Sequence, residues 1–184
     1  FVAYYAEDDN SIIARYSSAG VWQESLDFSG YANIIVLVSD ILSDSNNNLY
    51  VTGFYQGSVD FGGVTQTSLG AGKNYYILRY PTLSTIDMSF FSSSLNENLL
   101  NAIAIDYANN LVAVGGFSNS MTVNSNTYTS NGLYDALVIK FDRYMSFSQP
   151  IITTTNCDAN NMGVSGGVEG VVAPYHYYWS NSAN

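Results

Sequence analysis

The chain is poor in positive charge. Only 5 of its 184 residues are Lys or Arg, against 15 Asp or Glu, so the formal net charge is −10 at pH 7. A nucleic-acid-binding surface needs a cluster of cations that displaces counterions from phosphates. A basic membrane-surface helix needs Lys and Arg along one face. Five scattered cations are too few for either a nucleic-acid-binding surface or a basic membrane-surface helix. We therefore expect no nucleic-acid partner.

Cysteine, histidine and long apolar runs are also scarce. The chain has one Cys157 and one His176, whereas a transition-metal site takes several such ligands. We therefore predict no such metal site and no cofactor. Cys157 is either a buried thiol or half of a disulfide whose partner lies beyond the chain. The longest aliphatic run is residues 34–38, far below the roughly 20 residues that cross a bilayer, so this segment is not expected to insert into a membrane.

Apolar and aromatic residues are abundant in their place. Hydrophobic residues make up 47% of the chain, with 16 Tyr and 15 Gly, while charged residues make up 11%. This content is too apolar for charge-driven disorder. Short segments rich in Val, Ile, Tyr and Phe alternate with Asn, Gly, Ser and Asp, which predicts strands. No segment sustains a period of 3.6 residues, so we expect an all-β chain with almost no helix.

Two segments repeat at an offset of 62 residues. Residues 44–53 (DSNNNLYVTG) align with residues 106–115 (DYANNLVAVG). The Asn-rich parts have the composition of turns, because Asn tolerates positive φ and bonds to its own backbone. Gly53, Gly115 and Gly116 interrupt the strands that follow, where a backbone packs closely or bends.

A second block occurs three times. Residues 10–16 (NSIIARY), 74–80 (NYYILRY) and 135–141 (DALVIKF) align with one another. Arg15, Arg79 and Lys140 occupy the same position in this block. Three of the five cations thus follow the repeat, which indicates a structural use of charge rather than a basic binding patch.

Each repeat is predicted to contain four strands. The first set lies near 21–28, 36–43, 48–55 and 74–80, with a short segment near 58–67 at the edge of a long loop. The second set lies near 85–91, 100–106, 110–117 and 135–141. Four antiparallel strands per unit are the pattern of a propeller blade. Blades often have about 40–50 residues, and the extra length of these units of about 60 residues lies in loops around 62–63 and 124–125.

These repeats resemble the SBBP-type β-propeller repeat. That family has a strand reading GNxYVTG, a DFGG segment and a strand reading DAFVAK(Y/F)D. The counterparts are residues 48–53 (NLYVTG), 60–63 (DFGG) and 135–142 (DALVIKFD). The second repeat departs at Asn124-Ser125, where the family has Gly-Gly. The resemblance implies a secreted or cell-surface setting and no particular ligand.

The C-terminal part is similar to the start of a SprB-type repeat, found in surface adhesins of gliding bacteria. Residues 174–181 read PYHYYWSN, against PYxYxWSN in the family. Asp158-Ala159 and Ser182 depart from the family pattern. Tyr175, Tyr177 and Trp179 alternate and share one face of a strand. That apolar face needs a cover, which could be the propeller, another subunit or the rest of the module.

The predicted domain organisation follows from both resemblances. Residues 1–148 form propeller-like repeats, partial at 1–16, full at about 17–80 and 81–141, and partial at 142–148. Residues 149–184 form an incomplete Ig-like β-sandwich module. Two full repeats are fewer than the four to eight blades of a propeller. The chain is therefore expected to be a fragment of a longer protein, with an oligomeric propeller or an open stacked β array as alternatives.

Acidic and aromatic residues provide the remaining site candidates. Residues 7–10 and Asp40, Asp44 and residues 46–48 offer oxygen ligands for calcium, but no stretch has EF-hand spacing, and solvated turns are the better interpretation. The aromatic pairs Phe54-Tyr55 and Tyr75-Tyr76 could stack on sugars, although Tyr in strands mostly packs in cores.

No catalytic constellation is apparent. His176 lacks a neighbouring nucleophile and carboxylate, and Glu24, Glu97 and Glu169 lie in unrelated contexts. We predict no catalytic residues and leave the ligand-binding residues unassigned. The predicted function is a non-enzymatic adhesion or structural protein, extracellular or at the cell surface and bacterial, within a larger assembly or filament. It would bind protein partners or itself, or surface glycans; the alternative is an oligomeric propeller lectin.

Overall fold

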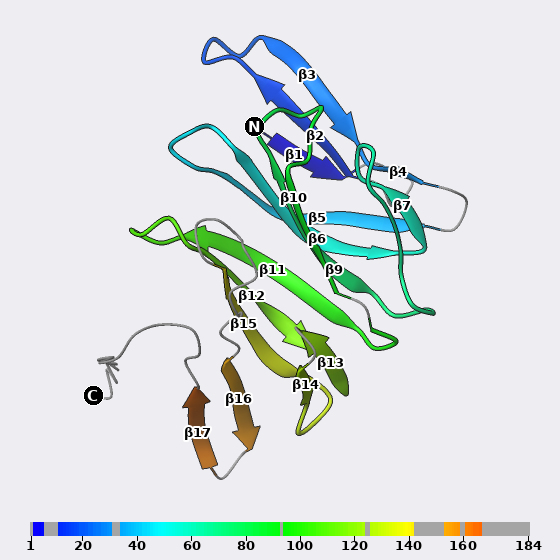
Figure 1. Cartoon of the computed structure of the whole chain (residues 1–184), viewed down its shortest axis with the longest axis vertical. Helices are drawn as coiled ribbons and strands as arrows, with labels where there is room; N and C mark the ends of the chain where they lie inside the picture. The colour runs from blue at the N-terminus through cyan, green and yellow to red at the C-terminus, as the bar shows by residue number, and fades with distance from the viewer. Residues whose placement is uncertain are drawn as a thin grey trace.

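The computed structural model describes residues 2–5, 11–30, 34–92, 94–123, 126–141, 153–158 and 161–166. Every regular element in this part is a strand, which confirms the all-β prediction. Within the same ranges, no helix has the length and apolar content needed to span a membrane. The strands form small antiparallel sheets, and Figure 1 shows them following one another along the chain from blue to brown.

Three sheets have the character of propeller blades, and we call them the first, second and third blade sheets. The first has the order β1-β2-β3, the second β10-β9-β6-β5 and the third β11-β12-β15-β16-β17. The first contains β1 (Val2–Tyr5), β2 (Ser11–Tyr16) and β3 (Trp22–Asp27). The second contains β5 (Ile35–Ser43), β6 (Leu49–Gln56), β9 (Asn74–Tyr80) and β10 (Met88–Phe91). The third contains β11 (Asn98–Ile105), β12 (Leu111–Phe117), β15 (Asp135–Phe141), β16 (Thr153–Asp158) and β17 (Asn161–Gly166).

Short hairpins lie where the sequence predicted long loops. In the second repeat, β13 (Ser120–Val123) pairs with β14 (Asn126–Thr129). In the first, β7 (Ser58–Asp60) pairs with β8 (Thr65–Thr67) and with β4 (Ser29–Gly30). Their polar Ser, Thr and Asn residues gave only a weak strand pattern. Along the chain, the β7–β8 hairpin lies between β6 and β9, and the β13–β14 hairpin lies between β12 and β15.

The sheets are offset by one strand from the repeat units read along the sequence. β3 pairs with β2 in the first blade sheet and not with β5. β10 likewise pairs with β9, which places Phe90 opposite Ile77. A strand pattern alone does not say whether an edge strand pairs with the preceding or the following strand, so this grouping emerges only in the structure.

A bulge recurs in the first strand of the second and third blade sheets. The pairing shifts between Val38 and Asp40 in β5, and between Leu100 and Ala102 in β11. A Cβ atom on Gly53 would lie 1.8 Å from the Leu37 carbonyl oxygen, and one on Gly115 would lie 1.9 Å from the Leu99 carbonyl oxygen. Both glycines are therefore required for close backbone approach, as their positions in the strands predicted.

The Asn-rich turns are built in the same way in both repeats. The Asp44 carboxylate accepts hydrogen bonds from the backbone N–H groups of Asn46 and Asn48, each at 2.9 Å. The Asp106 carboxylate accepts the equivalent bonds from Ala108 and Asn110 at 2.8 Å. Asn47 and Asn109 take positive φ values of 63° and 60°. These carboxylates thus organise the turns.

Two hydrophobic cores hold the blade sheets face to face. The first joins Ile13 and Phe28 to the second sheet, and the other joins the second sheet to the third. Much of the tyrosine content lies here: Tyr55, Tyr75 and Tyr76 are 1%, 0% and 0% exposed. Burial raises the pKa of Tyr55 to about 12, which shows how poorly the core would tolerate a phenolate.

The first part of the predicted Ig-like module continues the third blade sheet. β16 lies beside β15, with Thr155 opposite Ala136, and β17 pairs with β16. Residues 167–184, which include His176, Glu169 and the aromatic Pro-Tyr-x-Tyr-x-Trp motif, lie outside the described residues. The resemblance to an adhesin module therefore stays a prediction.

Candidate binding cleft

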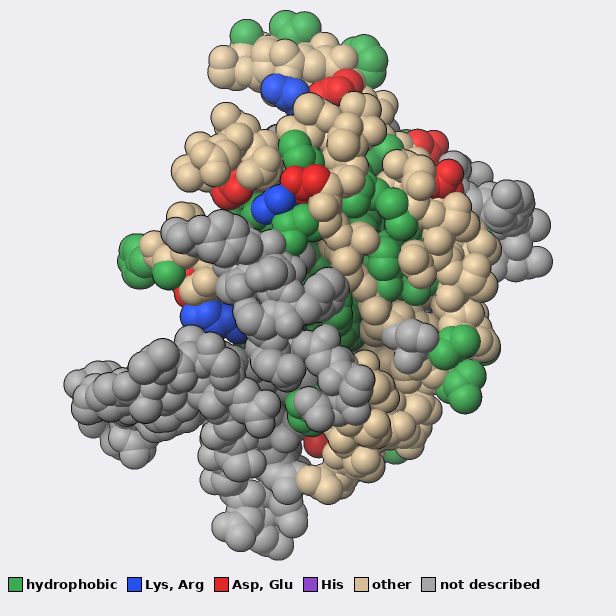
Figure 2. Space-filling model, viewed as in Figure 1, with side chains coloured by type: hydrophobic (Ala, Val, Ile, Leu, Met, Phe, Trp, Pro, Cys, Tyr) green, Lys and Arg blue, Asp and Glu red, His purple; other side chains and the backbone are tan. Residues whose placement is uncertain are grey.

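The three repeat cations lie on equivalent strands and each is paired with a carboxylate. Arg15 of β2 lies 3.0 Å from Glu24, Arg79 of β9 lies 2.7 Å from Asp87, and Lys140 of β15 lies 2.7 Å from Asp106. Figure 2 shows such blue and red side chains next to one another on the face in view. These pairs support the predicted structural use of Arg79 and Lys140, whereas Arg15 also lines the cleft described below.

The Asp106 carboxyl of the Lys140 pair has a shifted pKa. Burial raises the pKa of its carboxyl, but hydrogen bonds from Lys140, from the Asn110 side chain and from two backbone N–H groups lower it more. The net pKa lies well below the usual range of an aspartate. This carboxylate is consequently charged wherever the protein is folded near neutral pH.

A cleft of about 360 Å³ opens between the first and second blade sheets. It lies at the ends of β2, β5 and β9, where the Asn-rich turn of the second sheet faces the first sheet. The described part of the chain contributes nine lining residues: Arg15, Tyr16, Ser43, Asn47, Leu49, Tyr80, Pro81, Thr82 and Leu83. Because two sheets supply its walls, no single sequence motif marks it, and sequence reasoning missed it.

The cleft presents one cation among neutral groups. Among the described residues that line the cleft, Arg15 is the only charged one, and Tyr16 is 44% exposed. The phenol of Tyr80 donates a 2.8 Å hydrogen bond to the Phe61 carbonyl, so this side chain serves the core. The cleft therefore offers a guanidinium, an aromatic ring, hydroxyls and an amide to a ligand.

The Arg15 ion pair can exchange with a ligand at low cost. The Arg15 and Glu24 side chains are 46% and 39% exposed. Exposed pairs of this kind contribute about 0–1 kcal/mol, because water screens them and both side chains lose freedom. A ligand carboxylate could thus replace Glu24 on Arg15 with little loss of protein stability.

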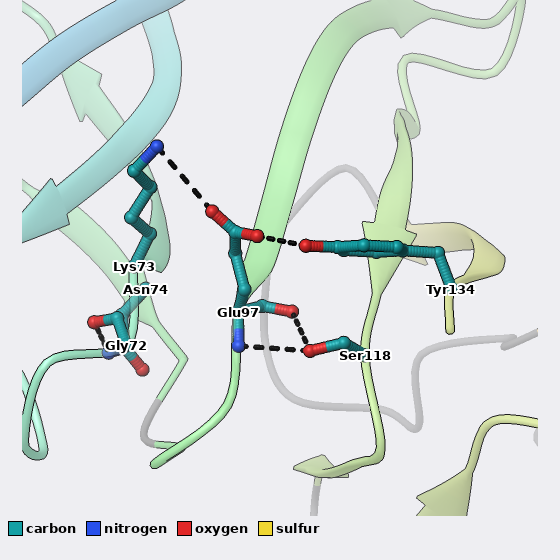
Figure 3. Close-up of polar contacts among 6 residues, drawn as sticks. All are labelled: Gly72, Lys73, Asn74, Glu97, Ser118 and Tyr134. Atoms are coloured by element: carbon teal, nitrogen blue, oxygen red, sulfur yellow. Dashed lines mark hydrogen bonds and ion pairs between the residues drawn. The ribbon is translucent and has the colours of Figure 1, made fainter. Parts of the chain in front are cut away.

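A second polar cluster joins the other ends of the second and third blade sheets. Lys73 lies 3.5 Å from Glu97, and the hydroxyl of Tyr134 donates a hydrogen bond to the same carboxylate. Figure 3 shows Lys73 and Tyr134 reaching Glu97 from opposite sides, with Ser118 bonded to the Glu97 backbone. The Lys73 ammonium also lies 5.0 Å from the centre of the Phe54 ring.

This cluster is built from the repeat. Lys73 directly precedes β9 and Tyr134 directly precedes β15, so both occupy the same repeat position and converge on one carboxylate. The hydrogen bond to Glu97 raises the pKa of Tyr134. The Lys73–Glu97 ion pair connects the second sheet to the third, and the other contacts lie within one sheet. We therefore assign the cluster a structural role. Sequence reasoning set Glu97 aside and did not find its partners.

The residues that the sequence suggested for calcium or sugar binding have other roles in the structure. Asp40 and Asp44 bond to backbone N–H groups, Glu24 pairs with Arg15, and residues 7–10 lie outside the described residues. The described residues contain no group of three or more His, Cys, Asp or Glu placed to hold a metal. Tyr55, Tyr75 and Tyr76 are buried, so the suggested sugar platform is wrong for these three residues because their rings fill the cores.

Comparison with known proteins supports the repeat assignment. No protein-family model matches the chain. Over 89 residues, 44% of this chain, the sequence is 34% identical to an uncharacterized WD repeat-containing protein, L264, of Acanthamoeba polyphaga mimivirus. The chain spans only 6% of the length of that protein. Together with the blade sheets, the similarity supports a repeat protein of the β-propeller type.

Proposed function

We propose that this chain is a binding module in which the cleft between the first and second blade sheets holds a segment of a partner protein. The observation that carries the proposal is the lining of the cleft: one exchangeable guanidinium, an exposed Tyr16 ring and neutral hydrogen-bonding groups. A protein segment with one carboxylate and neutral neighbours matches this chemistry, because Arg pairs with carboxylates through fixed donors.

The finer proposal concerns the setting. We place the module in an extracellular or cell-surface adhesion or structural protein that acts without turnover and forms part of a larger assembly. The resemblances of residues 1–148 to SBBP-type repeats and of residues 149–184 to a SprB-type repeat support this setting. The WD repeat-containing relative supports the repeat architecture and leaves the setting to experiment.

Selection from a displayed random-peptide library on the immobilised 184-residue chain tests the binding function. Enriched peptides are then titrated by fluorescence anisotropy against the wild type and against Arg15→Gln and Tyr16→Ala. We expect each cleft variant to weaken binding about tenfold, which corresponds to about 1.4 kcal/mol.

Matched controls come from outside the cleft. Lys140→Gln removes a cation at the equivalent position of the third sheet, and Tyr107→Ala removes a fully exposed ring from a turn of that sheet. Both controls should bind the peptides as the wild type does. Failure to enrich any peptide, or cleft variants within twofold of the wild type, would contradict the proposal. Glycan-array binding that Tyr16→Ala abolishes would favour the lectin alternative.

A further inference from the structure

The loop that leads into β15 carries an Asn131-Gly132 pair at the surface. Both residues are exposed, and a Cβ atom on Gly132 would meet no heavy atom within 4 Å. The Asn131 N–H donates a 3.2 Å hydrogen bond to Asp135 Oδ2, and Ser130 Oγ donates one of 3.1 Å to the Gly132 carbonyl. Within the described residues, the Gly132 N–H donates no hydrogen bond. This backbone nitrogen is therefore accessible to a reaction with its neighbour.

A side-chain amide that precedes glycine is a reactive arrangement. Once the Gly132 backbone nitrogen has lost its proton to the solvent, it attacks the side-chain Cγ of Asn131, closes a five-membered imide and expels ammonia. Water then opens the imide at one of its two carbonyl groups, which leaves a carboxylate as aspartate or as isoaspartate. The net reaction consumes water and releases ammonia, without an oxidant or a reductant. Glycine favours ring closure because it has no Cβ and adopts backbone angles that other residues avoid, and asparagine is a thermolabile residue.

The asparagines that end the Asn-rich turns are arranged differently. The Asn110 side-chain amide donates a 2.8 Å hydrogen bond to the Asp106 carboxylate, and the next residue, Leu111, is 2% exposed at the start of β12. The Asn48 side-chain amide is held in the same way by Asp44, at 2.7 Å. A fixed amide and a buried strand residue in place of glycine both hinder ring closure. Asn110 is thus an internal reference for the reactivity of Asn131.

The loop is anchored on both sides of the reactive pair. The Ser130 N–H donates a 2.7 Å hydrogen bond to the Asn119 carbonyl, and the Tyr134 hydroxyl donates one to Glu97, as Figure 3 shows. Isoaspartate adds a methylene group to the backbone between these two anchors. Either product also brings a second carboxylate close to that of Asp135, and like charges at short range repel. The modified loop therefore no longer fits between its anchors.

We propose that Asn131 is a site of spontaneous deamidation, at which its amide becomes a carboxylate, and that this modification releases Tyr134 from Glu97 as the protein ages. The conversion adds one negative charge to a chain whose net charge is already −10. Water is the only reactant that the step needs, so it proceeds in any aqueous setting. The proposal goes beyond the binding function and is independent of the cleft, which lies between the first and second blade sheets.

Incubation of the folded 184-residue chain in heavy-oxygen water at pH 8.5 and 37 °C, followed by peptide mass spectrometry, tests the site. We expect position 131 of the wild type to take up one labelled oxygen at least about tenfold faster than Asn110, or than position 131 of Gly132→Ala, where a Cβ restricts the backbone. Gly132→Ala is the matched control, since it keeps Asn131 and its Cβ meets open space. Equal labelling of residues 131 and 110, or equal labelling in Gly132→Ala, would overturn the proposal.

Nuclear magnetic resonance titration of the Tyr134 ring tests the structural consequence. The hydrogen bond to Glu97 raises the pKa of Tyr134, so this pKa should fall toward its ordinary value in the isoaspartate form separated after incubation. An unchanged Tyr134 pKa in that form would refute the release of Tyr134. Peptides selected on the cleft should bind the fresh and the incubated chain equally, which separates failure of this proposal from failure of the peptide-binding function.

Discussion

At the scale of single residues, the two repeats form the same contacts at equivalent positions. Gly53 and Gly115 sit against carbonyl oxygens at equivalent bulges, and Asp44 and Asp106 organise equivalent turns. These roles were partly predictable, because Asn-rich segments favour turns and a glycine within a strand usually marks a bulge or a close backbone approach. The partners of Glu97 were not predictable, because Lys73 meets it through the packing of two sheets and Tyr134 through the strand order of the third sheet.

Gly115→Ala should destabilise the protein by about 1–3 kcal/mol, the usual cost of forcing extra atoms into a packed site. The added Cβ would lie 1.9 Å from the Leu99 carbonyl oxygen, so the bulge would have to shift. Urea unfolding followed by tryptophan fluorescence gives the free energy of unfolding. Gly132→Ala is the control, since no heavy atom lies within 4 Å of its Cβ position. Equal stability of the two variants would show that the close approach is not required.

The depressed pKa of Asp106 predicts a pH-dependent contribution to stability. A carboxyl whose pKa is lower when folded stabilises the protein above its unfolded pKa of about 3.9 and loses this effect as pH falls toward the folded pKa. Asp106→Asn should therefore cost about 1 kcal/mol at pH 7, and the difference from the wild type should shrink between pH 5 and pH 3. Urea midpoints across this range measure it, and a constant difference would refute the assignment.

At the scale of elements, most strands were predictable and their grouping was not. β6, β9, β12 and β15 lie within two residues of their predicted bounds, because Val, Ile and Tyr runs end at Asn, Gly and Asp. The hairpin β13–β14 was missed because its strands are short and alternate Ser, Thr and Asn with the few apolar residues that reach the core. The pairing of β3 with β2, and of β10 with β9, depends on which sheet face is buried, which the strand pattern alone does not specify.

The bulge of β5 positions a contact between neighbouring sheets. Asp40 accepts the Ile103 N–H across the interface, so Asp40→Ala should leave this donor unpaired and cost about 1–3 kcal/mol. Asp40→Asn keeps an acceptor and should cost less. Amide hydrogen exchange at Ile103 should accelerate in Asp40→Ala and change little in Ser39→Ala, where an exposed bulge residue is altered. Unchanged Ile103 protection in Asp40→Ala would contradict this contact.

At the scale of the whole molecule, blade sheets stack through two apolar cores, and the possible binding surfaces lie where this stacking leaves an opening. The cleft lies between the first and second sheets, and an apolar face that includes the exposed Val114 lies on the third. Neither surface could be predicted from composition, because each depends on how sheets are placed rather than on any local motif. The low count of cations was nevertheless informative, since three of the five mark equivalent strands.

The central claim is that the strands form blade sheets offset by one strand from the sequence repeat. Cross-strand nuclear Overhauser effects in the isotope-labelled 184-residue chain test it most directly. We expect contacts of Phe90 with Ile77 and of Leu26 with Ile13, which place β10 beside β9 and β3 beside β2. A continuous ladder of contacts from β10 to β11, or from β3 to β5, would contradict it.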